Sequence, residues 1–196
     1  MDILFKTAFL VGMILVEVIR APHRARVSRA RRKGEMVATR VRGVEAVLMT
    51  LSFFGLYLLP LVYIFSSWLS FANYTLPDWA GWLGIILMVC ALYIIWRAHA
   101  DLGRNWSPSL EVVEDQKLVT GGIYRYMRHP IYTAMWLFTI AQALLLHNWI
   151  AGLGGLLIYI PLYFIRVPRE EQMMIDQFGD EYRTYMQRTG RFLPRV

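Results

Sequence analysis

Five long apolar stretches, separated by polar segments, dominate the hydrophobic pattern of this 196-residue chain. A helix needs about 20 mostly apolar residues to cross the hydrocarbon core of a bilayer, and somewhat fewer where flanking side chains reach the headgroups. The stretches that come close to this length cover about residues 3–19, 44–68, 79–98, 131–146 and 149–165. Pro60 falls in the second stretch and predicts a kink there. The pattern therefore predicts one all-α, membrane-embedded domain over residues 1–196, with about five transmembrane helices.

The basic residues gather in three of the polar segments. Of the 21 Lys and Arg residues, nine lie in 20–42, five in 97–128, six in 166–195, and one is Lys6. The connections 69–78 and 147–148 contain none. Basic residues in short loops favour the cytoplasmic side of a membrane. Five spans, with the N-terminus outside and the C-terminus in the cytoplasm, place all three basic segments on that side. We therefore expect a multi-pass integral membrane protein whose active surface is cytoplasmic.

The net charge of +7 could instead indicate a nucleic-acid-binding protein. Such a protein carries its basic face on a soluble core. Here the basic segments alternate with apolar stretches, and the mean hydropathy is +0.39. We therefore expect membrane lipids, and no nucleic acid, as partners of these segments, and we place the Arg-rich residues 20–43 along the lipid headgroups.

Two connections near the C-terminus have predictable shapes. The last two apolar stretches are joined by His147 and Asn148 alone, which predicts a tight antiparallel hairpin. Residues 169–187 place apolar side chains at three- and four-residue spacing, with charged residues between them. This pattern is typical of an amphipathic helix. We expect that helix to lie on the membrane or to cover a site.

The segment that precedes the fourth apolar stretch is the first candidate for chemistry. Gly121 and Gly122 predict a turn, and Pro130 suits the first turn of a helix, where its missing N–H costs nothing. A helix that starts at His129 would point free N–H groups and the positive end of its dipole at the cytoplasm, where they suit an anion. The alternative is that Arg128 and His129 only anchor the helix at the membrane interface.

The exit of the fifth stretch is the second candidate. Arg166 and Glu170 are four residues apart, so they share one face of a helix. The alternative is a surface ion pair worth a few tenths of a kcal/mol. Pro168 lies between the two residues and could distort their spacing.

These two blocks together resemble the isoprenylcysteine carboxyl methyltransferase family, with phospholipid N-methyltransferases as more distant relatives. The first block runs from Gly122 to Tyr132. The second block consists of Arg166, Glu170, Glu171, Phe178 to Tyr182, and Tyr185. The resemblance extends over about residues 97–194, and its motif regions are 99–130 and 166–194. Two blocks at this spacing are far more specific than Arg-His-Pro alone.

The resemblance implies S-adenosylmethionine as the methyl donor, with S-adenosylhomocysteine as its product. It implies a pocket that opens to the cytoplasm and a lipid-modified acceptor that enters from the bilayer. The cofactor-binding residues that it implies are Val119, Gly121, Gly122, Tyr124, Arg128, His129, Pro130, Tyr132, Glu170 and Glu171. Four of these residues also have an alternative interpretation that involves no cofactor. Tyr132 would be an interfacial aromatic residue, Glu171 a solvated carboxylate, and Tyr124 and Arg128 braces for the loop.

The chemistry implied by the resemblance requires alignment more than proton transfer. Methyl transfer from a sulfonium to a carboxylate partly neutralises both charges, so a pocket of low dielectric favours it. Orientation of the reacting groups can supply about 7 to 11 kcal/mol in ideal cases. We assign the catalytic roles to Arg166 and Glu170. Arg166 would hold the acceptor carboxylate as a bidentate partner. An amine acceptor must lose a proton, and Glu170 would then be the base.

Other kinds of function stay open or are disfavoured at this point. One enzymatic alternative is a phospholipid amine N-methyltransferase. A non-enzymatic alternative is a membrane scaffold or lipid-binding protein whose basic loops bind anionic headgroups. We expect no metal site, because the four histidines lie on different segments. By the predicted topology, His147 lies on the opposite face of the membrane from His23, His99 and His129.

Overall fold

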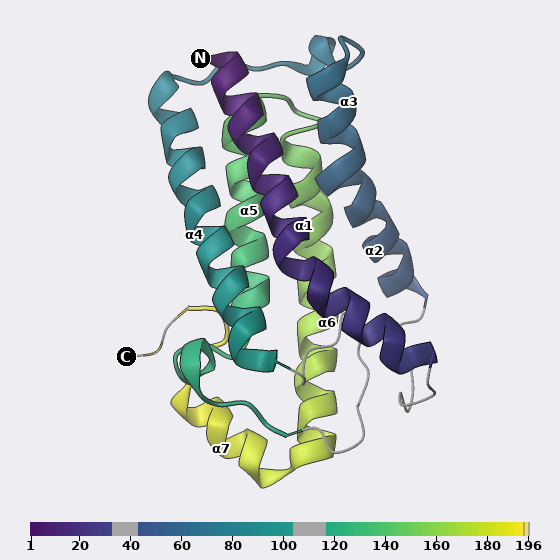
Figure 1. Ribbon diagram of the computed structural model, residues 1–196, viewed down its shortest axis with the longest axis vertical. Helices are drawn as coiled ribbons and strands as arrows, with labels where there is room; N and C mark the ends of the chain where they lie inside the picture. The colour runs from purple at the N-terminus through teal and green to yellow at the C-terminus, as the bar shows by residue number, and fades with distance from the viewer. Residues whose placement is uncertain (33–42, 104–116, 194, 196) are drawn as a thin grey trace.

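The computed structural model describes residues 1–32, 43–103, 117–193 and 195 (Figure 1). The ordered elements are α1 (Asp2–Arg32), α2 (Val44–Phe53), η1 (Phe54–Leu58), α3 (Leu59–Phe65), η2 (Ser70–Ala72), α4 (Asp78–Leu102), η4 (Gly122–Arg125), α5 (Pro130–Leu146), α6 (Leu153–Phe178) and α7 (Asp180–Arg188). Within these ranges all regular structure is helical, apart from two isolated β-bridges. The all-α prediction is confirmed. Parts of the predicted interfacial connection 20–43 and of the motif region 99–130 lie outside the described residues.

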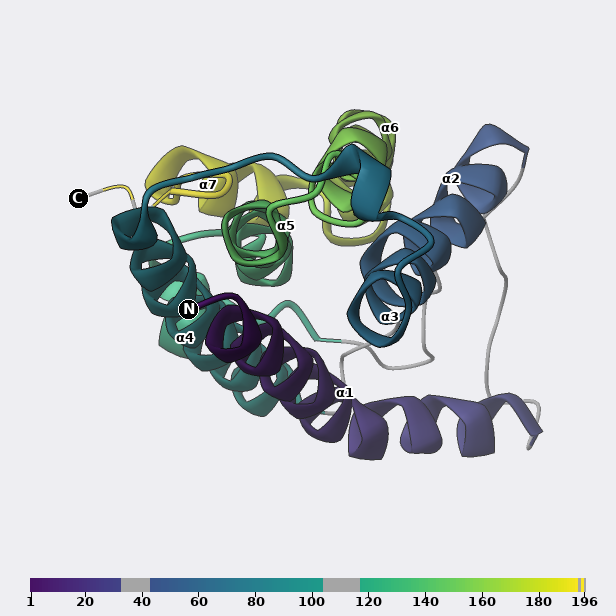
Figure 2. The ribbon, with the colours of Figure 1, turned by 90° about the horizontal axis from the view of Figure 1, so that it is seen from above.

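The long helices form a bundle. α1, the α2–α3 pair, α4, α5 and the first part of α6 run along the long axis of the molecule (Figure 1). α6 continues beyond the other helices, and α7 crosses that end of the bundle. The N-terminus lies at the opposite end, and α1 turns away from the bundle axis in its second half (Figure 2). Both candidate blocks therefore lie at one end of the molecule.

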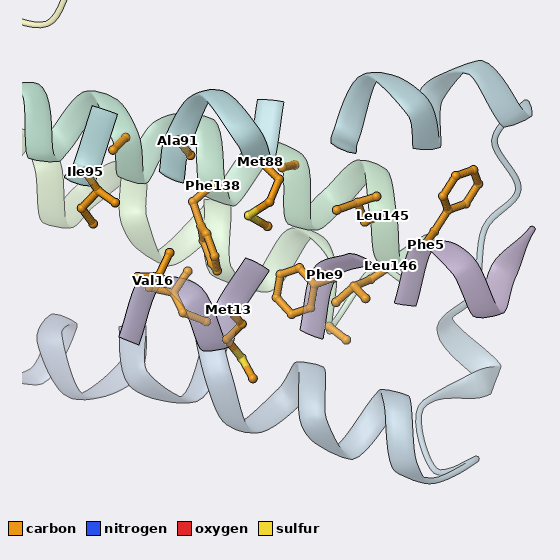
Figure 3. Close-up of a cluster of buried hydrophobic side chains, with 14 of the residues drawn as sticks. Phe5, Phe9, Met13, Val16, Met88, Ala91, Ile95, Phe138, Leu145 and Leu146 are labelled. Atoms are coloured by element: carbon orange, nitrogen blue, oxygen red, sulfur yellow. The ribbon is translucent and has the colours of Figure 1, made fainter. Parts of the chain in front are cut away.

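The hydrophobic core is centred on α1, α4 and α5 (Figure 3). Phe5, Phe9, Met13 and Val16 follow one another at three- and four-residue spacing on α1 and are all buried. They pack with residues of α4 and α5, among them Phe138. This stripe holds the first half of α1 in the bundle, because it faces the core on every turn.

Among the described residues, two helices are long and apolar enough to cross a membrane by length and composition. They cover Val44–Phe65 and Asp78–Leu102, with mean hydropathies of 2.1 and 2.0 in their most apolar windows. Only 28% and 33% of those windows is buried, so most of their apolar side chains point outward. An apolar outer surface of this kind suits lipid and not water. α5 is equally apolar in character but has 17 residues.

The second predicted span contains a π-helical turn. η1 occupies Phe54–Leu58 and ends two residues before Pro60. Proline cannot donate a hydrogen bond, and its ring would clash with the carbonyl of the fourth residue before it. A π turn is a common way to accommodate such a distortion inside a longer helix. The expected irregularity at Pro60 therefore takes the form of a π turn.

Two predicted boundaries near the C-terminus differ from the structure. The fifth span was expected to begin at residue 149, but α6 starts at Leu153, because the Asn148 side chain accepts hydrogen bonds from the N–H groups of Ile150 and Ala151 in a longer turn. The expected single helix 169–187 is divided between α6 and α7. Gly179 has φ 55°, which ends one helix and begins the next.

Candidate functional site

The start of α5 and the second half of α6 meet through the hydroxyl group of Tyr132. Arg166 Nε donates a hydrogen bond of 2.8 Å to this oxygen. The same hydroxyl donates a hydrogen bond of 2.6 Å to Glu170 Oε2. Tyr132 therefore links the two residues to which we assigned catalytic roles. Both project from the same side of α6, as their four-residue spacing predicted, and α6 continues through Pro168.

A cavity of about 330 Å³ surrounds this link. It is bounded by α1, α2, η1, the end of α4, η4, α5, α6, α7 and the segment 117–119. Its lining follows α6 from Tyr159 to Met174, a length of about 22 Å at the rise of an α-helix. The volume falls within the usual range of ligand pockets. The cavity is therefore elongated along α6 and large enough to hold a ligand.

The chemical character of the lining changes along its length. The part between α2, η1, α5 and the first half of α6 is mostly apolar and includes Met49, Phe53, Leu56, Met135 and Leu162. Further along α6 the lining becomes polar and includes Arg128, His129, Tyr132, Arg166 and Glu170. Arg166 lies where the two parts meet. An apolar ligand and a polar ligand could each find a suitable surface here.

His129 lies between two adjacent carboxylates. Its side chain is 3% exposed, and its Nε2 lies 3.2 Å from Glu171 Oε1. Its Nδ1 lies 3.7 Å from Glu170 Oε1. The imidazole ring thus connects the cavity-lining Glu170 with the more deeply buried Glu171.

Glu171 is the centre of an ionic cluster that we call the latch, which consists of Glu171, Arg128, His129 and Arg191. Arg128 Nε lies 3.2 Å from Glu171 Oε1, and Arg191 Nη2 lies 2.5 Å from Glu171 Oε2. Burial alone would raise the pKa of Glu171, but the hydrogen bonds from His129 and Arg191 lower it further than burial raises it, to about 2. The carboxylate is therefore ionised at neutral pH and paired, and it does not line the cavity.

The latch holds the chain that follows α7 against the start of α5. The N–H groups of Arg128 and His129 donate to the carbonyls of Gly190 and Arg191, at 2.9 and 3.0 Å. The hydroxyl of Thr133 donates to the carbonyl of Phe192 at 2.7 Å. The expected anion site at the helix start is therefore not open at these two N–H groups, because backbone from the C-terminal segment occupies them.

Glu45 is a site residue that the sequence arguments missed. It lies on the first turn of α2, and its side chain is 0% exposed. Its two carboxylate oxygens each lie 3.2 Å from a guanidinium group, one from Arg166 and the other from Arg169. A buried charge needs such partners. An ionisable residue at the edge of an apolar span is itself a signal of function or of specific pairing, and that signal could have drawn attention to Glu45.

The paired glycines brace the site and do not line it. Gly122 has φ 59°, and a Cβ atom there would lie 2.2 Å from the Asp101 carboxylate. The same carboxylate accepts a hydrogen bond of 2.8 Å from the N–H of Ile123. Only glycine permits this approach, which ties the loop to the end of α4. Gly121, Gly122 and Glu171 lie outside the cavity lining, while Val119, Tyr124 and Pro130 belong to it.

Tyrosine side chains form the end of the cavity beside α7. Tyr124, Tyr182 and Tyr185 line it, and the Tyr185 hydroxyl donates to the carbonyl of Tyr124 at 2.6 Å. Burial raises the pKa of Tyr185 to about 12, so its hydroxyl stays protonated and can donate. The periodicity of the segment 169–187 placed Tyr182 and Tyr185 on an apolar face but gave them no role in a site.

The region that contains the first block and the start of the second matches a known family. The model of the isoprenylcysteine carboxyl methyltransferase (ICMT) family matches residues 83–176. The resemblance found in the sequence is confirmed. The matched range extends from within α4 to within α6 and includes Tyr132, Arg166, Glu170 and Glu171.

Individual proteins named as isoprenylcysteine O-methyltransferases are also similar to this chain. The protein-S-isoprenylcysteine O-methyltransferase of Homo sapiens is 30% identical over 143 residues, which cover 67% of this chain and 49% of that protein. The probable protein-S-isoprenylcysteine O-methyltransferase of Oryza sativa subsp. japonica is 29% identical over 118 residues, 59% of this chain and 62% of that protein. The chain thus spans about half to three fifths of the length of these curated relatives.

A solved structure is also similar. It is the structure of the eukaryotic intramembrane Ras methyltransferase ICMT without a monobody, with a TM-score of 0.46 and 24% sequence identity. The match covers 78% of this chain and 52% of that chain.

Proposed function

We propose that this protein transfers a methyl group to the carboxylate of a prenylated cysteine, or of a similar lipid-linked acceptor, at the membrane interface. The observation that carries the proposal is the cavity along α6, whose apolar part joins a polar part at Arg166. The residues at that junction fall within the range that the ICMT family model matches. A lipid-linked acid needs both surfaces at once, because its chain is apolar and its reacting group is charged.

The proposal includes a membrane arrangement. Five spans, from α1, α2–α3, α4, α5 and α6, would place the N-terminus outside and the cavity at the cytoplasmic side. The outward-facing apolar side chains of Val44–Phe65 and Asp78–Leu102 support this arrangement. The apolar part of the cavity would then lie within the bilayer, and the polar part would lie at the headgroups.

The polar part of the cavity fits S-adenosylmethionine, which carries a sulfonium cation, an ammonium group and a carboxylate. When bound, this cofactor supplies an electrophilic methyl group on a positively charged sulfur. Glu170 offers a carboxylate to a cationic ligand, and the faces of Tyr124, Tyr182 and Tyr185 attract cations. Val119, Arg128, His129, Pro130 and Tyr132 would complete the cofactor site. Gly121, Gly122 and Glu171 would not touch the cofactor. The two glycines would fix the loop before α5, and Glu171 would hold the latch together.

Arg166 is the residue that we propose for the acceptor carboxylate. Its guanidinium is held in place by the hydroxyl of Tyr132 and by Glu45, so little side-chain freedom remains to be lost when a ligand binds. Glu170, through Tyr132, would fix the position of Arg166 relative to the cofactor site. No proton has to move for a carboxylate to accept a methyl group, so these residues would act by orientation and charge.

The experiment uses the protein in lipid nanodiscs, with radiolabelled S-adenosylmethionine and either an N-acetylated farnesylcysteine or phosphatidylethanolamine. We expect base-labile label on the farnesylcysteine, as a methyl ester gives. Base-stable label on the phospholipid headgroup would show an amine N-methyltransferase instead. A scaffold would show neither product and no saturable heat on titration with S-adenosylhomocysteine.

Glu170→Gln tests the site within the same assay. Loss of the cavity carboxylate should lower kcat/KM by about 100-fold, because one charge-assisted contact is worth up to about 3 kcal/mol. Glu181→Gln removes an exposed carboxylate from α7 and is the matched control, expected to stay within about twofold of the unmodified protein. Equal activities for the two variants would remove Glu170 from the proposed site.

A further inference from the structure

Two arginines of α1 line the cavity opposite the residues of α6. They are Arg20 and Arg24, which lie in the segment that we expected only to rest on the lipid headgroups. Arg20 follows Val16 by four residues, so it continues the core-facing stripe of α1. Arg26 Nη1 donates to the carbonyl of Gly103 at 2.8 Å, which fastens this part of α1 to the end of α4. The position of Arg20 is thus set by the fold.

Each of the other cavity-lining arginines has a carboxylate partner. Arg24 pairs with Glu17, Arg128 with Glu171, and Arg166 with Glu45. Glu17 also accepts a hydrogen bond of 2.6 Å from the hydroxyl of Tyr57. Arg20 differs: its Nε is buried and has no hydrogen-bond partner among the described residues. A buried guanidinium nitrogen without a partner is costly, and an anionic ligand in the cavity would remove that cost.

Arg20, on α1, and Arg166, on α6, both line the cavity. Both guanidinium groups act electrostatically on the hydroxyl of Tyr159, which lines the cavity on α6. That hydroxyl donates to the backbone carbonyl of Tyr132 at 3.0 Å, one turn into α5. The apolar part of the cavity begins here, so an anion between the two arginines would lie at the polar end of a lipid chain.

We propose that Arg20 binds the carboxylate of the methyl acceptor, together with Arg166, and that it selects acidic acceptors over uncharged ones. This inference rests on the proposed function, since it names the group that recognises the reacting end of the acceptor. A guanidinium and a carboxylate match in a bidentate geometry, which orients the carboxylate as well as holding it. A lipid phosphate could offer related chemistry to Arg20, so the experiment separates these two anions.

The experiment compares two ligands that differ only in charge: N-acetyl-S-farnesylcysteine and its carboxamide. Their affinities are measured in nanodiscs of phosphatidylcholine, and again with phosphatidylglycerol added. We expect Arg20→Gln to weaken binding of the acid, and to raise its KM, by about tenfold or more, with the affinity for the carboxamide unchanged. The dissociation constant of S-adenosylhomocysteine should stay within about threefold, because the cofactor site lies on the α7 side of Arg166.

Arg29→Gln is the matched control, because it removes the same charge from an exposed position on the same helix. Arg20→Lys should recover part of the preference for the acid, since it keeps the charge and loses the bidentate geometry. A melting temperature for each variant identifies any that fails to fold, and Arg20→Lys then carries the test.

Three outcomes would overturn the inference while the proposed function survives: unchanged KM for the acid in Arg20→Gln, equal weakening of acid and carboxamide, or an effect that follows the phosphatidylglycerol content. A failure of the proposed function looks different. In that case the unmodified protein itself transfers no methyl group to the farnesylcysteine.

Discussion

Glu170 and Glu171 are neighbours on α6, yet their carboxylates lie in different surroundings. Side chains one residue apart on a helix point about 100° away from each other. Glu170 is therefore directed to the cavity, where its side chain is 29% exposed and accepts a hydrogen bond from Tyr132. Glu171 is 5% exposed and pairs with Arg128 and Arg191 in the latch. Two neighbouring carboxylates of α6 thus differ in environment: one faces the cavity, and the other is buried in ion pairs.

The paired glutamates of the second block therefore have separate roles, one in stability and one in ligand binding. The latch joins α6, the start of α5 and the C-terminal segment, so Glu171 maintains the shape of the site. Glu170 is accessible to a ligand and has fewer ties to the fold. Substitutions that separate stability from activity can test this division.

The largest expected effect comes from Glu171→Ala. This change leaves the buried Arg128 and the half-buried Arg191 without their carboxylate, which costs about 3 to 5 kcal/mol. We expect the melting temperature in detergent to fall by roughly 10 °C, from a shift of about 2 to 4 °C per kcal/mol for a chain of this size. Glu170→Ala should lower it by no more than a few degrees. Similar losses of melting temperature in the two variants would contradict the division.

Acid should weaken the latch of the unmodified protein. The pKa of Glu171 is lowered to about 2 from an ordinary value of 4.5. The stability that the ionised carboxylate contributes is therefore complete above about pH 4.5 and is lost as the pH falls towards 2. Glu171→Gln has no such titration. We expect the difference in melting temperature between the unmodified protein and Glu171→Gln to shrink between pH 6 and pH 2; a constant difference would show that the carboxylate is not held as described.

The smallest expected effect comes from Tyr132→Phe, which removes the hydroxyl between Arg166 and Glu170. We expect kcat to fall about tenfold, because one hydrogen bond that orients Arg166 is worth roughly 1 to 1.5 kcal/mol. The melting temperature should change little, since Glu170 is partly exposed and water can replace the donor. Tyr126→Phe, at an exposed tyrosine, is the control. An unchanged kcat in Tyr132→Phe would show that the hydroxyl link does not position Arg166.

Features that local patterns encode could be predicted from the sequence. The start of α5 follows from Pro130 at the first helical position, and the shared face of Arg166 and Glu170 follows from their spacing. The division at Gly179 was missed although its signals are local, because a glycine followed by Asp180 and Glu181 is a typical end and restart of helices. The apolar spacing of residues 169–187 continues across Gly179, so that spacing alone predicted a single helix.

Contacts between distant parts of the chain could not be predicted in this way. Glu45 and Arg166 are 121 residues apart, and no periodicity relates them. Residues 190–192 lie outside the helices. Nothing in their sequence therefore indicated that their carbonyls would accept hydrogen bonds from the N–H and hydroxyl groups at the start of α5. The role of Arg20 depends on how α1 packs against the cavity, and its basic neighbours favoured an interfacial interpretation instead.

The π turn in η1 sets the rotational phase of the helix that carries Glu45. A π turn holds one residue more than an α turn, so α2 and α3 are offset by that extra residue. If evolution removed one residue from 54–58, the ladder would revert to a plain α-helix, and everything before it would rotate by about 100° relative to α3. Glu45 would then point away from Arg166, and Arg166 would lose its counter-ion. The extra residue of the π turn beside Pro60 thus determines whether Glu45 points at Arg166, 121 residues further along the chain.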